Sequence, residues 1–201
     1  MHMTIPVAHD FSCSWCWISL SQILDLKREF CVDFEWRGYE LYPDSVDLPI
    51  VNPLTLVPTK RPATPSRLTL AYAAQGMDKP VNRGPAPLRT HHAHEAVEFA
   101  KSSGIQDAVV ERLYRAYWEE GLDISDPVVV VEQTSTMVDS TKLRDVLSER
   151  RYASRIVAFD QPAFETGVYN VPTFWIGAER YAEQPYRVLR DALQKLRSAV
   201  S

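Results

Sequence analysis

The chain has 201 residues, of which 45% are hydrophobic and 24% are charged, a composition typical of a globular protein that buries its own core and unlike that of a disordered or membrane protein. Its formal net charge of -4 gives no overall basic field, so nucleic acid is not an expected partner. Residues 1–11 lack the charged and apolar regions of a secretory signal, and no stretch has the roughly 20 apolar residues needed to cross a bilayer. We therefore expect a cytoplasmic protein with no membrane partner.

The beginning of the chain predicts a strand, a helix and a second strand. Residues 4–8 are apolar and partly β-branched, which indicates a strand with Pro6 near its start or on an edge. Apolar residues then recur at helical spacing from Trp17 to Phe30, and residues 32–37 alternate between apolar and charged, as in a half-buried strand. Such a unit usually joins parallel strands by a right-handed crossover, which places the start of the helix at the carboxyl edge of the sheet.

A proline-rich connector and a mostly helical block follow. Six prolines between Tyr42 and Ser66 argue against a helix or a central strand there. Asp126 and Pro127 resemble an N-cap and a first-turn proline, so we expect a helix rather than a strand at the four valines that follow. The other helical patterns cover about 66–75, 88–103, 105–120, 141–167 with a break, and a final stripe at 189–200, after a buried strand at 173–176 and a turn at Gly177.

Two of the three cysteines, Cys13 and Cys16, form a CxxC at the start of the first predicted helix. A thiolate is the nucleophile in disulfide exchange, and a helix N-terminus favours that anion at Cys13. Cys16, one turn later, can displace a partner from a mixed disulfide on Cys13. Asp10 is a candidate proton acceptor for Cys16 if it is buried near it, and a simple loop or cap role is the alternative. The pair therefore predicts a reversible dithiol–disulfide couple.

Two other interpretations of the CxxC remain open. Both cysteines can be small buried hydrophobic residues, or they can be half of a zinc site. Zinc would need further ligands, for which Cys31, His91, His92 and His94 are the candidates, but no second CxxC and no HxxxH spacing is present. We expect no bound metal, a polar and solvated helix start at the three histidines, and a small core residue at Cys31.

A second segment, far downstream, carries a family resemblance. Residues 167–176 read GVYNVPTFWI and resemble the GVxxVPTF signature of DsbA-like thioredoxin folds. Together with CSWC at 13–16 and LYRAYWEEGLDI at 113–124, this makes nearly the whole chain similar to the FrnE-like branch of the DsbA family. The resemblance implies an α/β fold, a thioredoxin-like core interrupted by a large α-helical insertion.

The resemblance also implies a domain division. The first part of the core with the CxxC would be 1–50, the connector and helical insertion 51–155, and the second part of the core, with the cis-proline strand and the C-terminal helix, 156–201. The 156 positions from Cys16 to Pro172 leave room for such an insertion.

The resemblance further implies substrate-binding residues: Val171, Pro172, Ser14 and Trp15. Val171–Pro172 would be a cis bond facing the cysteines, where the Val171 backbone can pair with an extended substrate and Pro172 keeps metals from the thiols. Without the family, Pro172 simply begins the strand after it. Trp15 would shield the couple or contact apolar substrate, although packing alone would explain it, and Trp17 is expected in the core. Ser14 replaces the usual proline, so reduction potential and direction of catalysis do not transfer from relatives.

The leading hypothesis is a thiol–disulfide oxidoreductase that requires no cofactor. Cys13 attacks or is attacked, and Cys16 resolves the mixed disulfide. The expected partner is a disulfide- or thiol-containing protein or small molecule, with glutathione or a thioredoxin system as redox partner, and a homodimer is compatible with the sequence.

Two alternatives belong to other function classes. One is a glutathione-dependent isomerase or transferase, as in the related 2-hydroxychromene-2-carboxylate isomerases and kappa-class glutathione transferases, with Cys13 or Ser14 activating bound glutathione. Those relatives typically carry serine at the first position, so retention of both cysteines argues against it. The other is a redox-sensing, polypeptide-binding or chaperone-like module, motivated by Trp15, Trp17 and the connector.

Overall fold

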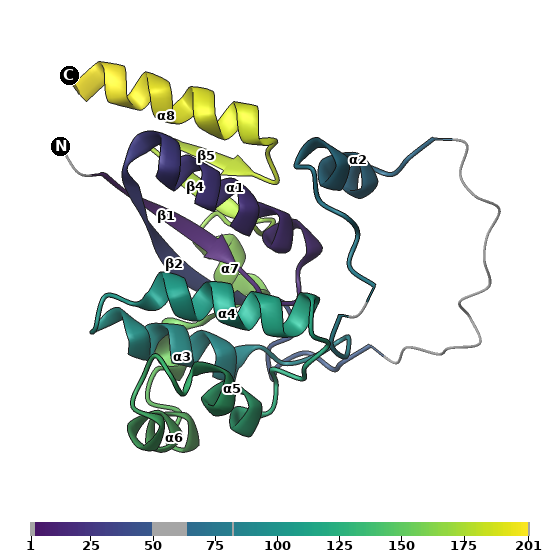
Figure 1. Cartoon of the computed structure of the whole chain (residues 1–201), viewed down its shortest axis with the longest axis vertical. Coiled ribbons are helices and arrows are strands. Elements are labelled where there is room, and N and C mark those ends of the chain that lie inside the picture. The colour runs from purple at the N-terminus through teal and green to yellow at the C-terminus, as the bar shows by residue number, and fades with distance from the viewer. Residues whose placement is uncertain (1–2, 50–63, 82, 201) are drawn as a thin grey trace.

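The computed structural model describes residues 3–49, 64–81 and 83–200, and its centre is a mixed sheet with the strand order β3-β2-β1-β4-β5 (Figure 1). β1 runs parallel to β2, which runs parallel to β3, whereas β4 is antiparallel to both β1 and β5. The strands are β1 (Met3–His9), β2 (Val32–Glu40), β3 (Val157–Ala158), β4 (Thr173–Ile176) and β5 (Glu179–Ala182).

The predicted strand–helix–strand opening is confirmed. α1 (Ser14–Phe30) joins β1 to β2, whose parallel register pairs Met3 with Val32 and His9 with Gly38. β1 lies in the centre of the sheet rather than at an edge. However, β1 pairs with β4 only at Val7 and Ala8, so at Pro6 it resembles an edge strand, where a missing N–H is tolerated.

The end of α1 corrects one expectation. Cys31 was expected in the core, yet it is exposed. It ends the helix in the left-handed conformation, with φ 51°, and its N–H donates to the carbonyl of Lys27. A residue in this position turns the chain out of the helix, a place that usually belongs to glycine, and here its side chain lies at the surface.

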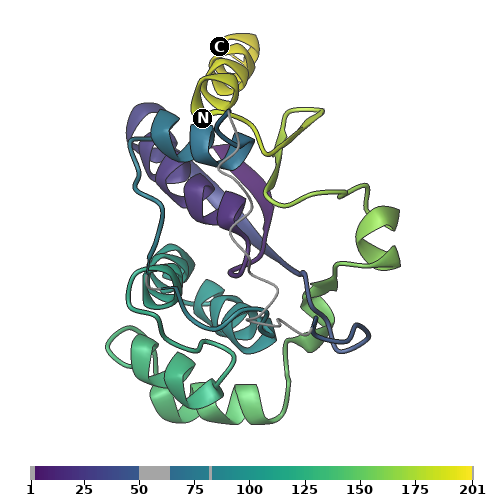
Figure 2. The same ribbon diagram turned by 90° about the vertical axis from the view of Figure 1, so that its right-hand side faces the viewer.

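The helical block lies between β2 and β3 in the sequence. Its helices within residues 91–148 gather on one side of the sheet, opposite α8 (Tyr186–Val200), whereas the helix at 67–74 lies apart from them and next to α1 (Figures 1 and 2). Its helix starts follow from local sequence. The side chain of Asp126 accepts the N–H of Val128 and caps the helix that Pro127 begins, as predicted. The helices are α2 (Arg67–Ala74), α3 (His91–Lys101), α4 (Gln106–Trp118), α5 (Pro127–Thr134) and α6 (Ser140–Ser148).

The region after α6 was only partly predicted. The pattern expected over 141–167 divides into α6, a short 3-10 turn at Ala153–Arg155, the two-residue strand β3 and α7 (Gln161–Glu165). The sequence did not predict β3, because two residues are too few to show an alternating hydrophobic pattern. It did not predict β5, because two of its four residues are charged and exposed. α8 (Tyr186–Val200) begins three residues before the predicted stripe. Of the connector, Pro53, Pro58 and Pro62 lie outside the described residues.

One hydrophobic core runs from the sheet into the helical block. Val7, Phe34 and Phe174 are buried within the sheet layer, and Leu113 of α4 belongs to the same cluster. Trp17 of α1 is buried as expected and stacks on Trp118 of α4, with ring centroids 6.2 Å apart. The first turn of α1, which carries the CxxC, is therefore held against the helical block as well as the sheet.

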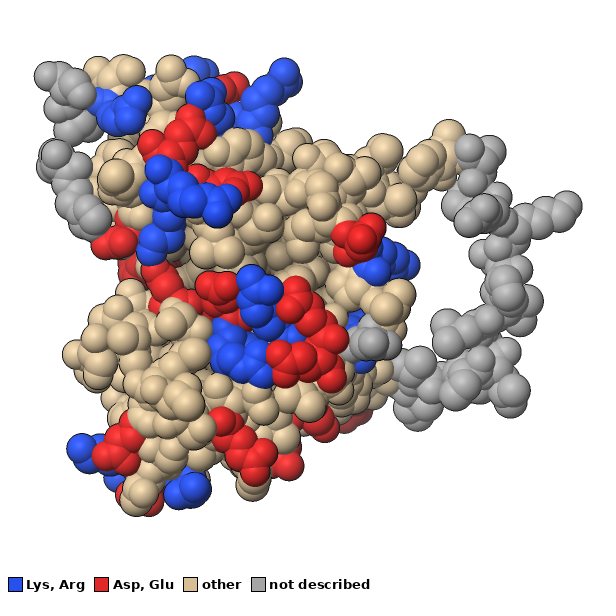
Figure 3. All heavy atoms as spheres, in the orientation of Figure 1, with Lys and Arg blue, Asp and Glu red and all other residues tan. Residues whose placement is uncertain are grey.

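The face seen in Figure 3 carries interspersed charges rather than a field of one sign. On α4, Arg112 pairs with Glu120, and Arg115 pairs with Glu111 and Glu119. Within the described ranges no helix is long and apolar enough to cross a membrane.

Candidate active site

Cys13 lies at the start of α1, just past the carboxyl end of β1. It occupies the N-cap position, and its carbonyl accepts the N–H of Trp17 at 3.0 Å. Its side chain makes no cap bond; instead its half-buried thiol donates to the carbonyl oxygen of Val171 at 3.3 Å. The Val171–Pro172 peptide bond is cis. The structure thus brings together two segments that are 158 positions apart in the chain.

Cys16 is the inner cysteine of the pair. It is free, like Cys13, but fully buried, and its sulfur accepts the N–H of Asp10 at 3.5 Å. Burial, together with the contact with Cys13, raises the pKa of Cys16 well above its ordinary value. One thiol is therefore open to a partner, whereas the other remains protonated in the interior.

The Asp10 carboxylate lies beneath the pair and is fully buried. Oδ1 accepts the N–H and the hydroxyl of Ser12 at 2.7 and 2.5 Å, and Oδ2 accepts the N–H of Leu41 at 3.1 Å and the hydroxyl of Thr90 at 2.6 Å. Burial favours the neutral acid, but the contact with His94 at 3.6 Å and the bonds from Ser12 and Thr90 outweigh it and lower the pKa of Asp10. Its acceptor positions are filled, which favours the loop-anchoring role over the proton acceptor.

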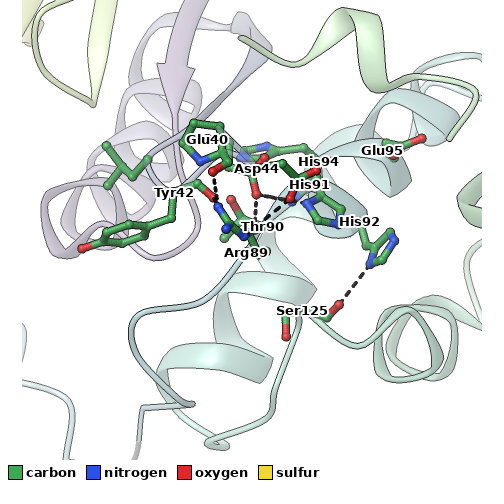
Figure 4. A network of polar contacts seen from close by, with 12 residues as sticks. Glu40, Tyr42, Asp44, Arg89, Thr90, His91, His92, His94, Glu95 and Ser125 are labelled. Carbon is green, nitrogen blue, oxygen red and sulfur yellow. Dashed lines mark hydrogen bonds and ion pairs between the residues drawn. The ribbon is translucent and has the colours of Figure 1, made fainter. Parts of the chain in front are cut away.

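The histidines near the start of α3 are not a solvated helix start, so that expectation was wrong. His94 is only 1% exposed and faces Asp10. It fits because Gly38 lies beside it: an added Cβ there would come within 2.7 Å of the His94 ring. His91 contacts Glu40 at 3.2 Å, and His92 contacts the carbonyl of Ser125 at 3.0 Å (Figure 4).

Tyr114 of α4 extends the buried polar cluster. Its hydroxyl donates to the carbonyl of Asp10 at 3.1 Å and lies 3.0 Å from Nδ1 of His9. Because a carbonyl can only accept, the tyrosine proton points to Asp10, and His9 must donate through Nδ1. Burial and the nearby charges of His94 and Lys101 lower the pKa of His9 well below its ordinary value, so the ring is neutral.

A cavity of about 530 Å³ opens between α1, α2 and the β5–α8 connection, and neither Cys13 nor Cys16 is among its lining residues. Trp15 and Pro172, two predicted substrate-binding residues, line it together with Leu70 of α2. Across its mouth the Arg67 guanidinium lies 5.1 Å from the centre of the Trp15 ring and 3.4 Å from the carboxylate of Glu183. A ligand here would meet an apolar wall with one charge pair at its rim.

Tyr72 of α2 also reaches the site. It is buried, and burial raises its pKa to about 12 although contact with Ser14 acts in the other direction. Sequence reasoning missed Tyr72 and Arg67 because no motif marks them. Tyr114 lies within residues 113–124, which carry part of the family resemblance, but the apolar face of α4 indicated only a packing role for this helix. Across the described part of the chain, no three His, Cys, Asp or Glu side chains converge as a metal centre would require.

Comparison with known proteins supports the same architecture. A family model described as a DSBA-like thioredoxin domain matches residues 4–194. Among solved structures, a probable DsbA oxidoreductase from Streptomyces coelicolor has 22% identity and a TM-score of 0.72, covering 98% of this chain and 91% of that one. The cytosolic disulfide reductase DsbM from Pseudomonas aeruginosa, with GSH, has 17% identity and 0.63, covering 98% and 97%.

A third similar structure is that of an isomerase. A 2-hydroxychromene-2-carboxylate isomerase has 16% identity and a TM-score of 0.67, covering 99% of this chain and 100% of that chain. No curated protein matches. The expected fold, a thioredoxin-like core with a helical insertion, is confirmed.

Proposed function

Because the chain belongs to the DSBA-like thioredoxin domain family, we propose that it is a thiol–disulfide oxidoreductase that works through Cys13 and Cys16. The observation that carries the proposal is the place of Cys13, a free, half-buried thiol at a helix N-terminus with its sulfur 3.3 Å from the Val171 carbonyl. A partner segment lying extended along Val171 would bring its own sulfur next to Cys13.

The exchange takes two steps. The Cys13 thiolate attacks one sulfur of a partner disulfide, and the other sulfur leaves as a thiolate. Cys16 then attacks the Cys13 sulfur, the bond from Cys13 to the partner breaks, and the proton of Cys16 ends on the departing thiol. The protein dithiol loses two electrons, and the partner disulfide becomes two thiols; the reverse sequence oxidises a partner. Because burial raises the pKa of Cys16, that thiol stays protonated until a mixed disulfide forms beside it.

The cavity between α1, α2 and the β5–α8 connection supplies a binding surface for the partner. Trp15 and Pro172 line it, Ser14 lies in the first turn of α1, and the Val171 carbonyl lies at the cysteine. We assign these four residues to substrate binding, with the largely apolar wall favouring an apolar group next to the reacting sulfur.

The test is to trap the intermediate. Cys16→Ser protein mixed with glutathione disulfide should accumulate one glutathione on Cys13, detected by mass spectrometry, because the resolving thiol is gone. The matched control is Cys31→Ser, which removes an exposed thiol and should leave the wild-type reaction intact. The proposal fails if Cys16→Ser traps neither glutathione nor a model peptide disulfide, or if the adduct forms equally well in Cys13→Ser.

A glutathione-dependent isomerase or transferase is the second candidate. One observation favours it: the cavity of about 530 Å³ lined by Trp15 and Pro172 is large enough for a small molecule, and an isomerase shares the fold. This function needs no resolving thiol. Glutathione-dependent turnover of an aromatic substrate that survives Cys16→Ser would support it over disulfide exchange.

We further propose that the protein acts in the cytoplasm with glutathione as its redox partner or co-substrate. The support is the disulfide reductase of the same fold, described as cytosolic and as solved with GSH. A thioredoxin system is the alternative for recycling. Supplying oxidised protein with either system and following its return to the dithiol separates the two.

A further inference from the structure

Asp10 contacts both cysteines through its backbone. Its N–H lies 3.5 Å from the Cys16 sulfur, and its carbonyl accepts the N–H of Cys13 at 3.3 Å and the hydroxyl of Tyr114 at 3.1 Å. The orientation of this one residue therefore decides whether an N–H donor faces the Cys16 sulfur. Burial raises the pKa of Cys16, and the Asp10 N–H acts against that rise.

Hydrogen bonds to the side chain of Asp10 hold the residue in that orientation. One of its four donors is the hydroxyl of Thr90, at 2.6 Å. Thr90 occupies the N-cap position of α3, yet its side chain makes no cap bond. A threonine at an N-cap normally uses its oxygen for the helix N–H groups. Here the hydroxyl is directed to Asp10 instead.

Thr90 is itself held in place by Glu40, at the end of β2. The Glu40 carboxylate accepts the N–H of Thr90 at 2.8 Å and that of His91 at 3.1 Å (Figure 4). Both Glu40 and Thr90 are buried. Buried polar groups of this kind cost free energy unless every member is bonded. The hydrogen bonds from Thr90 to Glu40 and to Asp10 thus connect the end of β2 and the start of α3 to the cysteine loop.

We propose that Thr90 and Tyr114, acting through Asp10, are positioning residues for Cys16: they hold the Asp10 N–H against the Cys16 sulfur, where it stabilises the charge that develops during exchange. A donor already in place needs no reorganisation when the charge appears. The inference rests on the proposed function, since it assigns these residues a part in the second step of that exchange.

The two steps of the reaction with glutathione disulfide separate the effect. In the first, Cys13 attacks and one glutathione leaves as a thiolate. In the second, Cys16 attacks the Cys13 sulfur, the second glutathione leaves with the electron pair of the broken bond, and the proton of Cys16 is transferred to it. Charge develops on the Cys16 sulfur only in the second step, so only that step should depend on the positioning residues.

The experiment compares Thr90→Val and Tyr114→Phe with two matched controls. Thr134→Val removes a buried hydroxyl that bonds Val130 within its own helix, and Tyr117→Phe removes a hydroxyl on α4 that bonds Pro85. Reduced proteins are mixed with glutathione disulfide, quenched with acid and analysed by mass spectrometry. We expect the second step to slow about tenfold in each test variant, as for loss of one hydrogen bond to a developing charge, with the first step and both controls unchanged. Equal slowing of both steps, or none, would overturn the inference.

A second measurement does not depend on redox activity. In the reduced protein the amide proton resonance of Asp10 should move on Cys16→Ala, and it should move much less when Thr90→Val is already present. No response to Cys16→Ala would overturn the positioning inference even if exchange is normal. A normal response in a protein that does not react with glutathione disulfide would instead refute the proposed function alone.

Discussion

Replacing Asp10 with alanine tests how much of the fold depends on the carboxylate beneath the cysteines. The change leaves four buried or part-buried donors without their acceptor: the N–H groups of Leu41 and Ser12 and the hydroxyls of Ser12 and Thr90. An unsatisfied buried donor costs about 1–3 kcal/mol, and removing one member of a buried charged network costs about 3–5 kcal/mol. We expect a loss of about 4 kcal/mol, because water entering the space relieves part of the sum.

Urea unfolding followed by tryptophan fluorescence measures this loss, since Trp17 and Trp118 are both buried near the site. The control is Asp126→Ala, which removes an exposed N-cap with one bond to the N–H of Val128 and should cost about 1 kcal/mol. If the two variants lose the same free energy of unfolding, the buried carboxylate does not anchor the loop. If Asp10→Ala protein does not fold, Thr90→Val removes one of the four bonds and should cost about 1–2 kcal/mol.

Three more predictions concern single groups. The pKa of His9 lies well below 6.5 in the folded protein, so the unfolded chain binds more protons and stability falls as the pH drops below about 6.5; the free energy of unfolding between about pH 8 and pH 5 should fall more steeply in wild type than in His9→Gln, and parallel slopes would contradict this. Iodoacetamide should label Cys13 and the exposed Cys31 well before buried Cys16, and peptide mapping that finds Cys16 labelled first would refute the assigned burial. Cys31→Gly should raise stability by about 0.5–1 kcal/mol in urea unfolding, because glycine adopts a φ of 51° without strain; a loss would contradict it, and the rate of disulfide exchange should stay unchanged.

The sequence predicted those parts of the fold that local pattern determines. The spacing from Trp17 to Phe30 and the alternation after it gave the first helix and the parallel pair of strands. The cap at Asp126 and the first-turn proline Pro127 correctly predicted a helix despite the strand preference of the four valines that follow. Both signals act within one helical turn, so the local sequence reveals them. The contact between Cys13 and Val171 was also expected. That expectation came from the family resemblance, because no local pattern links segments so far apart in the chain.

The remaining features depend on tertiary contacts that no local pattern encodes. Thr90 and Tyr114 reach Asp10 across 80 and 104 positions. Tyr114 lies within the 113–124 segment of the family resemblance, but neither that segment nor any other pattern indicated a contact with Asp10. His94 is buried because Gly38 gives it space, which the spacing of the histidines does not reveal. Cys31 is exposed because of its left-handed backbone at a helix end, where the hydrophobicity of cysteine has little influence.

The contact between Cys13 and Val171 also determines when the site can form during synthesis. The first cysteine leaves the ribosome early, whereas the carbonyl that faces its sulfur lies 158 positions later. At translation rates of about 5–20 residues per second, that interval lasts on the order of ten seconds. Throughout it the Cys13 thiol lacks the Val171 carbonyl that it contacts in the folded protein.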